Sequence, residues 1–472
     1  MKIKFKPFHI ILFLFCSVVI FLFINLTFLS CAQSDTSIQI GNFESYMARE
    51  LIDDIEKKYD AKFVYYPNNE AIEAKFEKYY DIAIPSSYEI INLWSQNLIQ
   101  KIDWAKFNIT NTNGDHITNA KEAITLFNQD EINYLNKLTK IFTIKMIEDK
   151  RTNQTEPITN ILDWCVPYFF QNFIFAYKGK EIKFYNENGS EVIDKNNLTW
   201  NDIFYTVSSL NPKCEPRFKP TKKTHLGMID DARTIYEIAK ILDKSKKTQN
   251  DMACDANNIF SLLTKYFTNK SWINLQSDSG IIARNLSIDN GGYSAAFAWS
   301  GDIFYAATQH AEEENFGFDA DNFHIVKPKN LLISFDGLVI NKKGSIIKQK
   351  EERIYEIIKQ IALDGCGIER HKLFNKKNNE FSYWTVRNFH RLGYTPPLKN
   401  LYEALINIDD PCGYWNEFLD LSKNKNYKKT LKMYTDIIQI NQDNQYKIYE
   451  EPLDHITNSN INWAWMQIKN NL

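Results

Sequence analysis

Residues 37–88 have the sequence SIQIGNFESYMARELIDDIEKKYDAKFVYYPNNEAIEAKFEKYYDIAIPSSY, and this stretch decides the fold. Short apolar runs alternate here with longer segments whose apolar residues recur at helical spacing. The pattern predicts strands at 37–40, 62–66 and 81–84, and helices across 46–55, across 69–78 and from Ser87 onward. Such alternation predicts a largely parallel sheet with crossover helices, and sheets of this kind bind ligands at the carboxyl ends of their strands.

The rest of the chain continues this alternation after a polar interruption. Residues 107–160 are rich in Asn and Thr and are predicted to form a surface insertion with one helix near 130–150. Further strands are predicted at 172–177, from Leu226, at 295–299 and at 331–335, with a helix from Asp230-Asp231 to about Asp243. From about Glu351 the chain is predicted to be mainly helical.

Length and charge exclude some classes of protein. A chain of 472 residues that is 44% hydrophobic exceeds the length at which one core usually divides, so two lobes are expected. The 56 basic residues nearly balance the 58 acidic ones. Because the chain lacks the excess of basic residues that nucleic-acid binders carry, no nucleic-acid partner is expected.

The cysteines indicate neither a metal site nor a complete disulfide framework. Of seven cysteines, Cys16 and Cys31 lie in the N-terminal leader, which leaves an odd number in the rest of the chain. None forms a CxxC pair or a clustered zinc spacing. Buried free thiols are therefore expected, with one disulfide as the alternative, and neither a metal nor a cofactor is expected.

The N-terminus predicts a membrane tether. Lys2, Lys4 and Lys6 precede a nearly uncharged apolar run at 10–29, which is typical of a targeting segment. The run ends in Phe28-Leu29-Ser30-Cys31, which resembles a bacterial lipobox, so residues 1–31 are interpreted as a leader and Cys31 as a lipidated first residue. Phe28 stands where Leu is usual, and the run approaches the length of a spanning helix, so an uncleaved anchor is the alternative. Either route holds the chain at the cell membrane, facing the extracellular side.

Seven short motifs follow one another in a fixed order. They are Asn42–Tyr46, Tyr80–Tyr88, Val166-Pro167-Tyr168, Met228–Arg233, Ala298-Trp299-Ser300-Gly301, Leu332–Leu338 and Leu392–Pro396. In this order they resemble the bacterial spermidine/putrescine-binding proteins of ABC importers. The resemblance extends from residue 38 to about residue 400, and about the last seventy residues match poorly.

The resemblance implies an α/β protein with the two-lobed periplasmic-binding-protein-like fold (type II), in which a hinge closes the lobes on a ligand in the cleft between them. Residues 37–164 and about 334–398 would form the first lobe, including the polar insertion at about 107–160. Residues 165–333 and about 399–472 would form the second. The implied function is the extracellular substrate-binding subunit, which passes a polyamine to a permease driven by an ATPase and catalyses no reaction.

The resemblance also implies a set of ligand-facing residues. They are Phe43, Glu44, Tyr46, Ser86, Tyr88, Asp231, Thr234, Trp299, Ser334, Asp336 and Tyr394. Their chemistry suits a polyamine, because a methylene chain with ammonium groups needs aromatic walls and carboxylates. Three positions depart from the family. Thr234 replaces a Glu and Ser334 replaces a Trp, whereas Glu44 adds an acid where a small hydroxylated residue is usual, so the choice between putrescine, spermidine and another diamine stays open.

Several of these residues have a structural alternative. Asp336 precedes Gly337 and could be a turn residue, and Trp299 could belong to the core. Of Asp230 and Asp231, one is expected to cap a helix and Asp231 to bind ligand. Arg233 would repel a cation and is expected to pair with a neighbouring acid.

Other functions receive less support from the sequence. No GxSxG, GxxxxGK[ST], GxGxxG or HExxH motif is present, so no catalytic residues are expected. Acidic residues at 312–321 lack the Gly of a calcium loop and are expected to be a solvated face. Two alternatives remain, the same fold binding a sugar or peptide and a structural or adhesive surface lipoprotein.

Overall fold

The computed structural model describes most of the chain after the leader. The described residues are 37–208, 218, 226–243, 255–267, 273–288, 292–308, 320–343, 348–377, 380–409, 413–415, 427–440 and 446–470. The leader with Cys31, and the acidic residues 312–319, lie outside these ranges. Within them, no helix has the length and apolar character that a membrane span requires.

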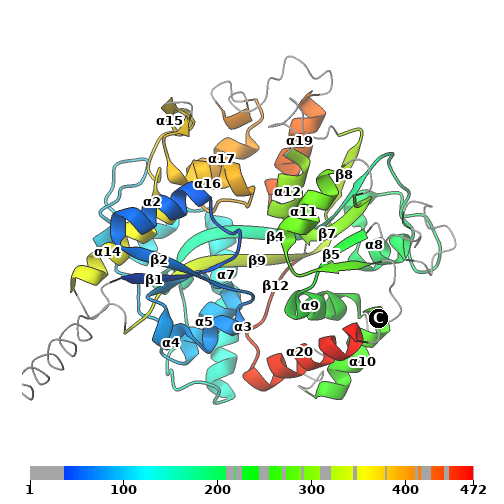
Figure 1. The fold of residues 1–472 in the computed structure, drawn as a ribbon, viewed down its shortest axis with the longest axis horizontal. Coiled ribbons are helices and arrows are strands. Elements are labelled where there is room, and N and C mark those ends of the chain that lie inside the picture. The colour runs from blue at the N-terminus through cyan, green and yellow to red at the C-terminus, as the bar shows by residue number, and fades with distance from the viewer. Residues whose placement is uncertain are drawn as a thin grey trace, which may run out of the picture.

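One sheet runs through the molecule, and helices cover its two faces (Figure 1). Among the described residues the strand order is β2-β1-β3-β9-β4-β7-β5-β6, with β12 beside β9 and β8 beside β4. The strands at the N-terminal end are β1 (Ile38–Phe43), β2 (Ala61–Tyr66) and β3 (Ile82–Ala83), which pair in parallel. The predicted parallel sheet with crossover helices is therefore present in this half.

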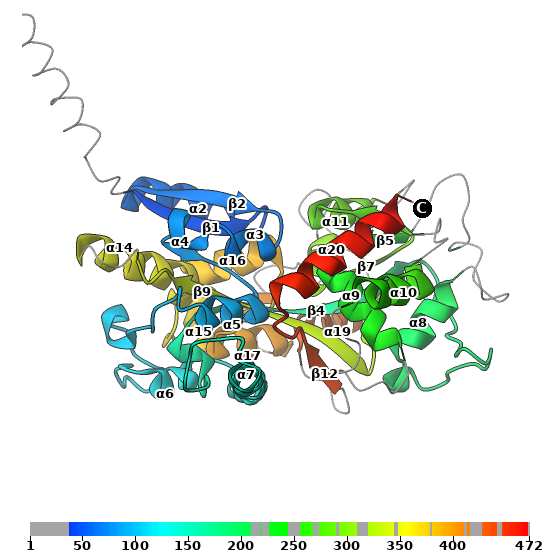
Figure 2. The ribbon, with the colours of Figure 1, turned by 90° about the horizontal axis from the view of Figure 1, so that it is seen from below.

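Two long strands connect the halves of the sheet. β4 (Val166–Lys178) and β9 (Asn330–Ile340) pair antiparallel, and almost every residue of both is buried. β3 pairs with β9 at Val339 and Ile340, whereas β4 pairs with β7 (Ala295–Trp299). Figure 2 shows β4 and β9 passing between the two groups of helices.

The second half of the sheet contains shorter strands. β7 pairs in parallel with β5 (Leu226–Ile229), and β5 with β6 (Asn274–Gln276). β8 (Phe323–Val326) pairs with β4. β12 (Tyr446–Tyr449) pairs in parallel with β9, a strand inside the region that was predicted to be mainly helical.

We call β1–β3 and the helices around them the first lobe. Its helices are α2 (Arg49–Tyr59), α3 (Glu70–Glu73), α4 (Phe76–Tyr79), α5 (Ser87–Ser95), α7 (Gln129–Glu148), α14 (Lys348–Ile358), α15 (Arg370–Leu373) and α16 (Trp384–Leu392). α2 forms where the apolar spacing predicts it and buries Leu51, Ile52 and Ile55. Each such side chain stabilises the fold by about 1.5–3 kcal/mol on burial.

We call β5–β7 and the helices around them the second lobe. Its helices are α8 (Trp200–Val207), α9 (Ala232–Leu242), α10 (Ala256–Phe267), α11 (Ser279–Ser287), α12 (Ser300–Thr308) and α20 (His455–Lys469). α8 begins with a capping box between Thr199 and Asp202, which satisfies amide groups at the helix start. α17 (Lys399–Ile406) packs on α15 and also on α19 (Tyr427–Ile438), and the predicted division of the chain at 399 stays a prediction.

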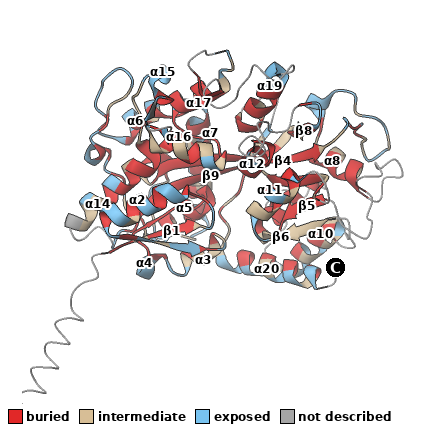
Figure 3. Ribbon diagram, turned by 45° about the horizontal axis from the view of Figure 1, so that its top comes forward, coloured by how far each residue is buried: buried red, intermediate tan, exposed pale blue. Residues whose placement is uncertain are grey.

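The core follows the central strands, where Figure 3 shows continuous burial. The segment 107–160 contributes to this core more than the prediction of a surface insertion implied, because Phe107, Phe127 and Ile132 are fully or almost fully buried. The predicted helix at 69–78 is interrupted between α3 and α4. The mixture of α/β elements otherwise agrees with the predicted fold class.

Candidate ligand-binding site

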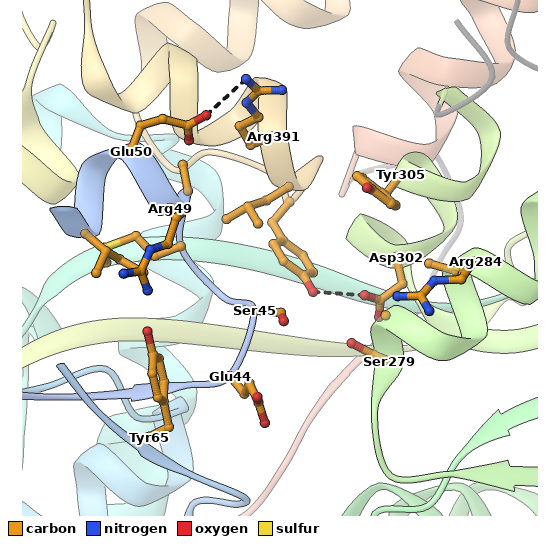
Figure 4. A pocket seen from close by; sticks show the side chains of 17 residues that line it. Glu44, Ser45, Arg49, Glu50, Tyr65, Ser279, Arg284, Asp302, Tyr305 and Arg391 are labelled. Atoms are coloured by element: carbon orange, nitrogen blue, oxygen red, sulfur yellow. Dashed lines mark hydrogen bonds and ion pairs between the residues drawn. The ribbon is translucent and has the colours of Figure 1, made fainter. Parts of the chain in front are cut away.

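A cavity of about 640 Å³ lies between the two lobes (Figure 4). One wall comes from the loop after β1, from the start of α2, from β2 and from the end of α16; the other comes from α11 and α12. The polar and aromatic side chains on these walls are Glu44, Ser45, Arg49, Glu50, Tyr65, Ser279, Arg284, Asp302, Tyr305, Arg391 and Tyr394. The cavity therefore follows the carboxyl ends of β1 and β7, where ligands of α/β sheets bind.

The first wall begins directly after β1. Glu44 and Ser45 are exposed, and Ser45 has a positive φ of 56°. A left-handed conformation at a residue other than Gly is uncommon and often marks a functional turn. This turn places Glu44 in the cavity wall, and its expected ligand role stays a prediction.

The second wall contains a buried acid that the ligand set did not include. Asp302, in the first turn of α12, is only 7% exposed. Its Oδ1 accepts a hydrogen bond of 3.0 Å from the hydroxyl of Tyr394, and its Oδ2 has no hydrogen-bond partner among the described residues. Burial raises the pKa of Asp302 to about 6, although the nearby hydroxyl groups of Ser279 and Tyr394 act in the opposite direction.

Tyr394 is fixed by packing on both sides. A Cβ at Gly301 would lie 1.9 Å from a carbon of the Tyr394 ring, so only glycine fits at this position. On its other side, the Tyr394 ring lies 4.8 Å from the ring of Tyr46, centroid to centroid. Tyr394 thus connects the cavity acid to the centre of the interlobe boundary.

Two of the three cavity arginines have acidic partners. Arg49 pairs with Asp53 at 2.8 Å, and Arg391 pairs with Glu50 at 3.1 Å. Arg284 is exposed, and the structure shows no ion pair for it among the described residues. Glu44, Asp302 and Arg284 thus line the cavity without an ion pair among the described residues.

Asp336 lies at the centre of a buried hydrogen-bond network. Its Oδ2 accepts hydrogen bonds from the hydroxyl of Tyr46 (2.5 Å) and from Gln171 Nε2 (3.0 Å), and its Oδ1 accepts from Ser86 Oγ (2.6 Å) and Ser334 Oγ (3.4 Å). Asp336 is 2% exposed, and burial raises the pKa of its carboxyl group despite these four hydrogen bonds. Both oxygens are thus bound by protein donors, and the expected ligand role of Asp336 stays a prediction.

The predicted residues of the second lobe form a helix cap. The Oδ2 of Asp231 accepts hydrogen bonds from the backbone N–H and the hydroxyl of Thr234, at 2.8 and 2.7 Å. Asp230 instead accepts from the indole N–H of Trp465 and pairs with Lys469. Asp231 and not Asp230 is therefore the capping residue of α9, so the expected division of roles between the two acids is wrong, and the ligand role of Asp231 stays a prediction.

The remaining aromatic residues of the set are dispersed. Phe43 packs edge-on against Tyr46 and Tyr66, and Trp299 packs edge-on against Phe173. The structure brings Tyr46, Ser86, Ser334 and Asp336 into one network, with Tyr394 against it. Glu44 lies in the cavity wall, whereas Tyr88, Asp231 and Thr234 lie at another part of the interlobe boundary.

Sequence reasoning missed two residues with defined roles. Asp302 immediately follows Trp299-Ser300-Gly301 and could have been found from that position, since it comes just after the carboxyl end of a predicted strand. Gln171 lies within an apolar run, and no pattern indicates that its amide contacts Asp336 and Tyr46. Only the pairing of β4 with β9 brings Gln171 opposite Ser334.

The described residues also bear on cysteine and metal chemistry. Cys165 and Cys366 are free thiols. Burial raises the pKa of both thiols, to about 12 for Cys366. Within the described part of the chain, no group of His, Cys, Asp and Glu side chains has an arrangement that could hold a metal ion.

Comparisons with known proteins agree with this architecture. A family model described as hypothetical lipoprotein (MG045 family) matches residues 1–462. The spermidine/putrescine-binding periplasmic protein of Escherichia coli (strain K12) is 22% identical over 214 residues, which cover 44% of this chain and 44% of that protein. The protein of the same description from Salmonella typhimurium is 23% identical over 215 residues, with the same two shares. The match thus spans less than half the length of these curated relatives.

A solved structure shows the same fold over most of the chain. It comes from Listeria monocytogenes, is assigned to a spermidine/putrescine ABC transporter, and superposes with a TM-score of 0.52 at 16% identity. The superposition covers 92% of this chain and 99% of that one. The chain therefore has the same mixed α/β fold as that protein.

Proposed function

This chain belongs to the MG045 family of hypothetical lipoproteins, and we propose that it captures a polyamine at the outer face of the cell membrane and passes it to an ABC permease driven by an ATPase. A lipid on Cys31 would tether it there, with an uncleaved anchor as the alternative. The proposal builds on the solute-binding fold and on the cavity between the lobes.

One observation carries the proposal: Asp302 is a buried acid of the cavity wall, and its buried Oδ2 has no hydrogen-bond partner among the described residues. A buried carboxylate without a full set of hydrogen bonds is costly in the empty protein. An ammonium group that enters the cavity would supply both the missing hydrogen bonds and the opposite charge. A cationic ligand is therefore the class that this wall favours.

The rest of the cavity suits an amine with a methylene chain. Glu44 offers a second carboxylate on the opposite lobe, so a ligand with two ammonium groups could contact both lobes at once. The rings of Tyr65, Tyr305 and Tyr394 line the same cavity and can pack against methylene groups. The relatives named for spermidine and putrescine support the same ligand class.

Arg284 favours a second candidate ligand, an amine that also carries a carboxylate. Its charge lies in the cavity wall and is exposed. Water and salt screen an exposed charge far more than a buried one, so Asp302 should dominate and a polyamine remains the first candidate. An amino-acid ligand would instead use Asp302 for its ammonium group and Arg284 for its carboxylate.

The proposal is tested by isothermal titration of the full chain in detergent micelles. The ligands are putrescine, spermidine, ornithine, maltose and a short neutral peptide. The matched variants are Asp302→Asn and Glu50→Gln, which each remove one cavity acid. Glu50 already pairs with Arg391, so its replacement should matter less.

We expect putrescine or spermidine to bind to the wild-type chain, and Asp302→Asn to weaken binding much more than Glu50→Gln does. Strong binding of ornithine that depends on Arg284 would favour the second candidate. Binding of maltose or peptide alone, or of no solute at all, would contradict a polyamine ligand.

A further inference from the structure

A second group of buried charges lies at the boundary between the lobes, apart from the cavity. In Figure 1, α3 and α5 lie on the first-lobe side of this boundary, and α9 lies on the second-lobe side. The two sides touch where the guanidinium carbon of Arg233 on α9 lies 4.8 Å from the centroid of the Tyr88 ring on α5. The segment between β12 and α20 supplies Glu450, which is 6% exposed. The boundary therefore contains ionisable groups from both lobes.

Carboxyl groups outnumber cations in this group. Arg233 pairs with Glu237 at 2.8 Å, and Lys240 pairs with the same carboxyl group at 3.1 Å. The predicted pairing of Arg233 with a neighbouring acid is therefore confirmed. Both cations thus share one acid, and the structure shows no ion pair among the described residues for the other acids of the group, which are Glu70, Glu89, Asp231 and Glu450, with Glu73 and Glu451 near them.

Glu70 of α3 is the first-lobe acid that meets charges of the second lobe. Its Oε1 accepts a hydrogen bond of 3.2 Å from the Tyr88 hydroxyl. Burial raises the pKa of the Glu70 carboxyl group, and the charge of Asp231 from the second lobe raises it further, whereas Arg233 lowers it. Lost hydration and a nearby like charge both disfavour the charged form of an acid. Contact between the lobes therefore favours the protonated form of Glu70.

Glu450 is affected by both lobes at once. Burial raises the pKa of its carboxyl group well above the usual range, and the charge of Arg233 opposes this shift. The charges of Glu237 and Asp231 in the second lobe, and of Glu70 in the first, raise the pKa further. Closed lobes thus hold Glu450 where its charged form is disfavoured.

We propose that Glu70 and Glu450 form a pH-sensitive latch between the lobes, in which neutral carboxyl groups let the lobes close and charged ones hold them apart. The latch acts whichever solute the cavity binds. Separation of the lobes would return both groups to water, where a glutamate has a pKa of about 4.3. Because the raised pKa values belong to the closed form, its advantage over the open form is complete below about pH 4.3 and is lost as the pH rises through those values.

The first test measures the separation of the lobes without a solute. Ile141 of α7 in the first lobe and Met466 of α20 in the second are exposed, so an azide-bearing amino acid at each position can carry a dye that does not react with the cysteines. Single-molecule energy transfer on the full chain in detergent micelles gives the ratio of closed to open molecules. We expect this ratio to be at least about tenfold higher at pH 5 than at pH 8, since one unit of pKa shift corresponds to a factor of about ten.

The second test removes the charges of the latch. Every chain of this series carries Asp302→Asn, because the carboxyl group of Asp302 is buried at the same boundary and has a pKa of about 6. With Glu70→Gln and Glu450→Gln together, the ratio at pH 8 should rise at least about tenfold, and it should change less than about threefold between pH 5 and pH 8. Glu156→Gln is the matched control at an exposed residue and should leave the pH dependence unchanged.

A ratio that does not change with pH, or that falls toward pH 5, would overturn the latch. A folded double variant that keeps the full pH dependence would also overturn it, and circular dichroism melting curves establish whether the variant is folded. Should the double variant fail to fold, the wild-type ratio decides together with Glu70→Gln alone, which should weaken the pH dependence. Because no solute is present, failure of the latch would leave the proposed polyamine ligand intact.

Discussion

The hydroxyl of Tyr394 donates a hydrogen bond of 3.0 Å to Asp302 across the boundary between the lobes. Tyr394 follows α16 of the first lobe, and Asp302 belongs to α12 of the second. The bond satisfies one carboxylate oxygen, and the other is buried without a hydrogen-bond partner among the described residues. A ligand that binds the second oxygen would therefore act on a bond that already joins the lobes.

Asp302→Asn should weaken polyamine binding by more than about tenfold, which corresponds to about 1.4 kcal/mol. Asn keeps the shape of Asp but removes the charge that would pair with an ammonium group. Loss of one partner of a desolvated charge pair typically costs about 2–5 kcal/mol. Isothermal titration measures the affinity, and Tyr394→Phe, which keeps the charge, should have a smaller effect. Equal affinities of wild type and Asp302→Asn would exclude Asp302 from the site.

Polyamine affinity should fall at acidic pH. Because burial raises the pKa of Asp302 to about 6, the carboxyl group is charged at neutral pH and becomes neutral as the pH falls below 6. At pH 5 about one carboxyl group in ten remains charged, so affinity should be about tenfold lower than at pH 7.5. Titrations at both pH values measure this change. Asp302→Asn should lack this dependence, and an equal dependence in the variant would assign the titration to another group.

Asp336→Asn should destabilise the fold. Asp336 is buried and accepts four hydrogen bonds, and Asn would place an N–H₂ group where one carboxylate oxygen accepts them. A mismatched buried polar group costs about 1–3 kcal/mol, so the free energy of unfolding should fall by about that amount. Urea unfolding of the ligand-free chain measures it. A variant as stable as wild type would show that the hydrogen bonds to Asp336 contribute little to the stability of the ligand-free chain.

Gly301→Ala should weaken ligand binding although the added methyl group contacts Tyr394 and not the ligand. Its Cβ would lie 1.9 Å from the Tyr394 ring, so the ring must move away from Asp302 and Tyr46. We expect affinity to fall at least as far as in Tyr394→Phe, together with a lower melting temperature. Gly189→Ala is a control of backbone effects alone, because nothing lies within 4 Å of its added Cβ and its φ is +73°. Wild-type affinity in Gly301→Ala would show that the position of Tyr394 is unimportant.

Cys31→Ala should abolish the membrane tether if the leader ends in a lipobox. Cells fed a labelled fatty acid should incorporate label into the wild-type chain and none into the variant. The wild-type chain should also partition into the detergent phase after cleavage of the leader. An unlabelled wild-type chain that remains membrane-bound would favour the uncleaved anchor.

The sequence predicts the elements whose local pattern is strong. β7 has the predicted bounds, and Pro85-Ser86 separates β3 from α5 as expected. Local spacing cannot show which strands pair, and the antiparallel contact of β4 with β9 joins segments far apart in the chain. The strand β12 was missed for the same reason, since its partner is β9.

The site was predictable only in part. The motifs around Tyr46, Ser86 and Asp336 identify residues that meet in one network. They do not show that both carboxylate oxygens of Asp336 accept hydrogen bonds from protein donors within that network. Gln171 of β4 donates a hydrogen bond to Asp336, although the residues around it are apolar and predict only a core strand. The hydrogen bond between Tyr394 and Asp302 depends on how the two lobes face each other, which no single segment encodes.

The central position of β9 has a consequence for how the chain folds. β3 of the first lobe pairs with Val339 and Ile340 of β9. The ribosome synthesises these two residues long after it has synthesised β3. Contacts between residues so distant in sequence form late and slow folding. During synthesis the N-terminal part would keep an unpaired strand edge until β9 emerges. The first lobe would therefore complete its sheet only after most of the chain has been synthesised.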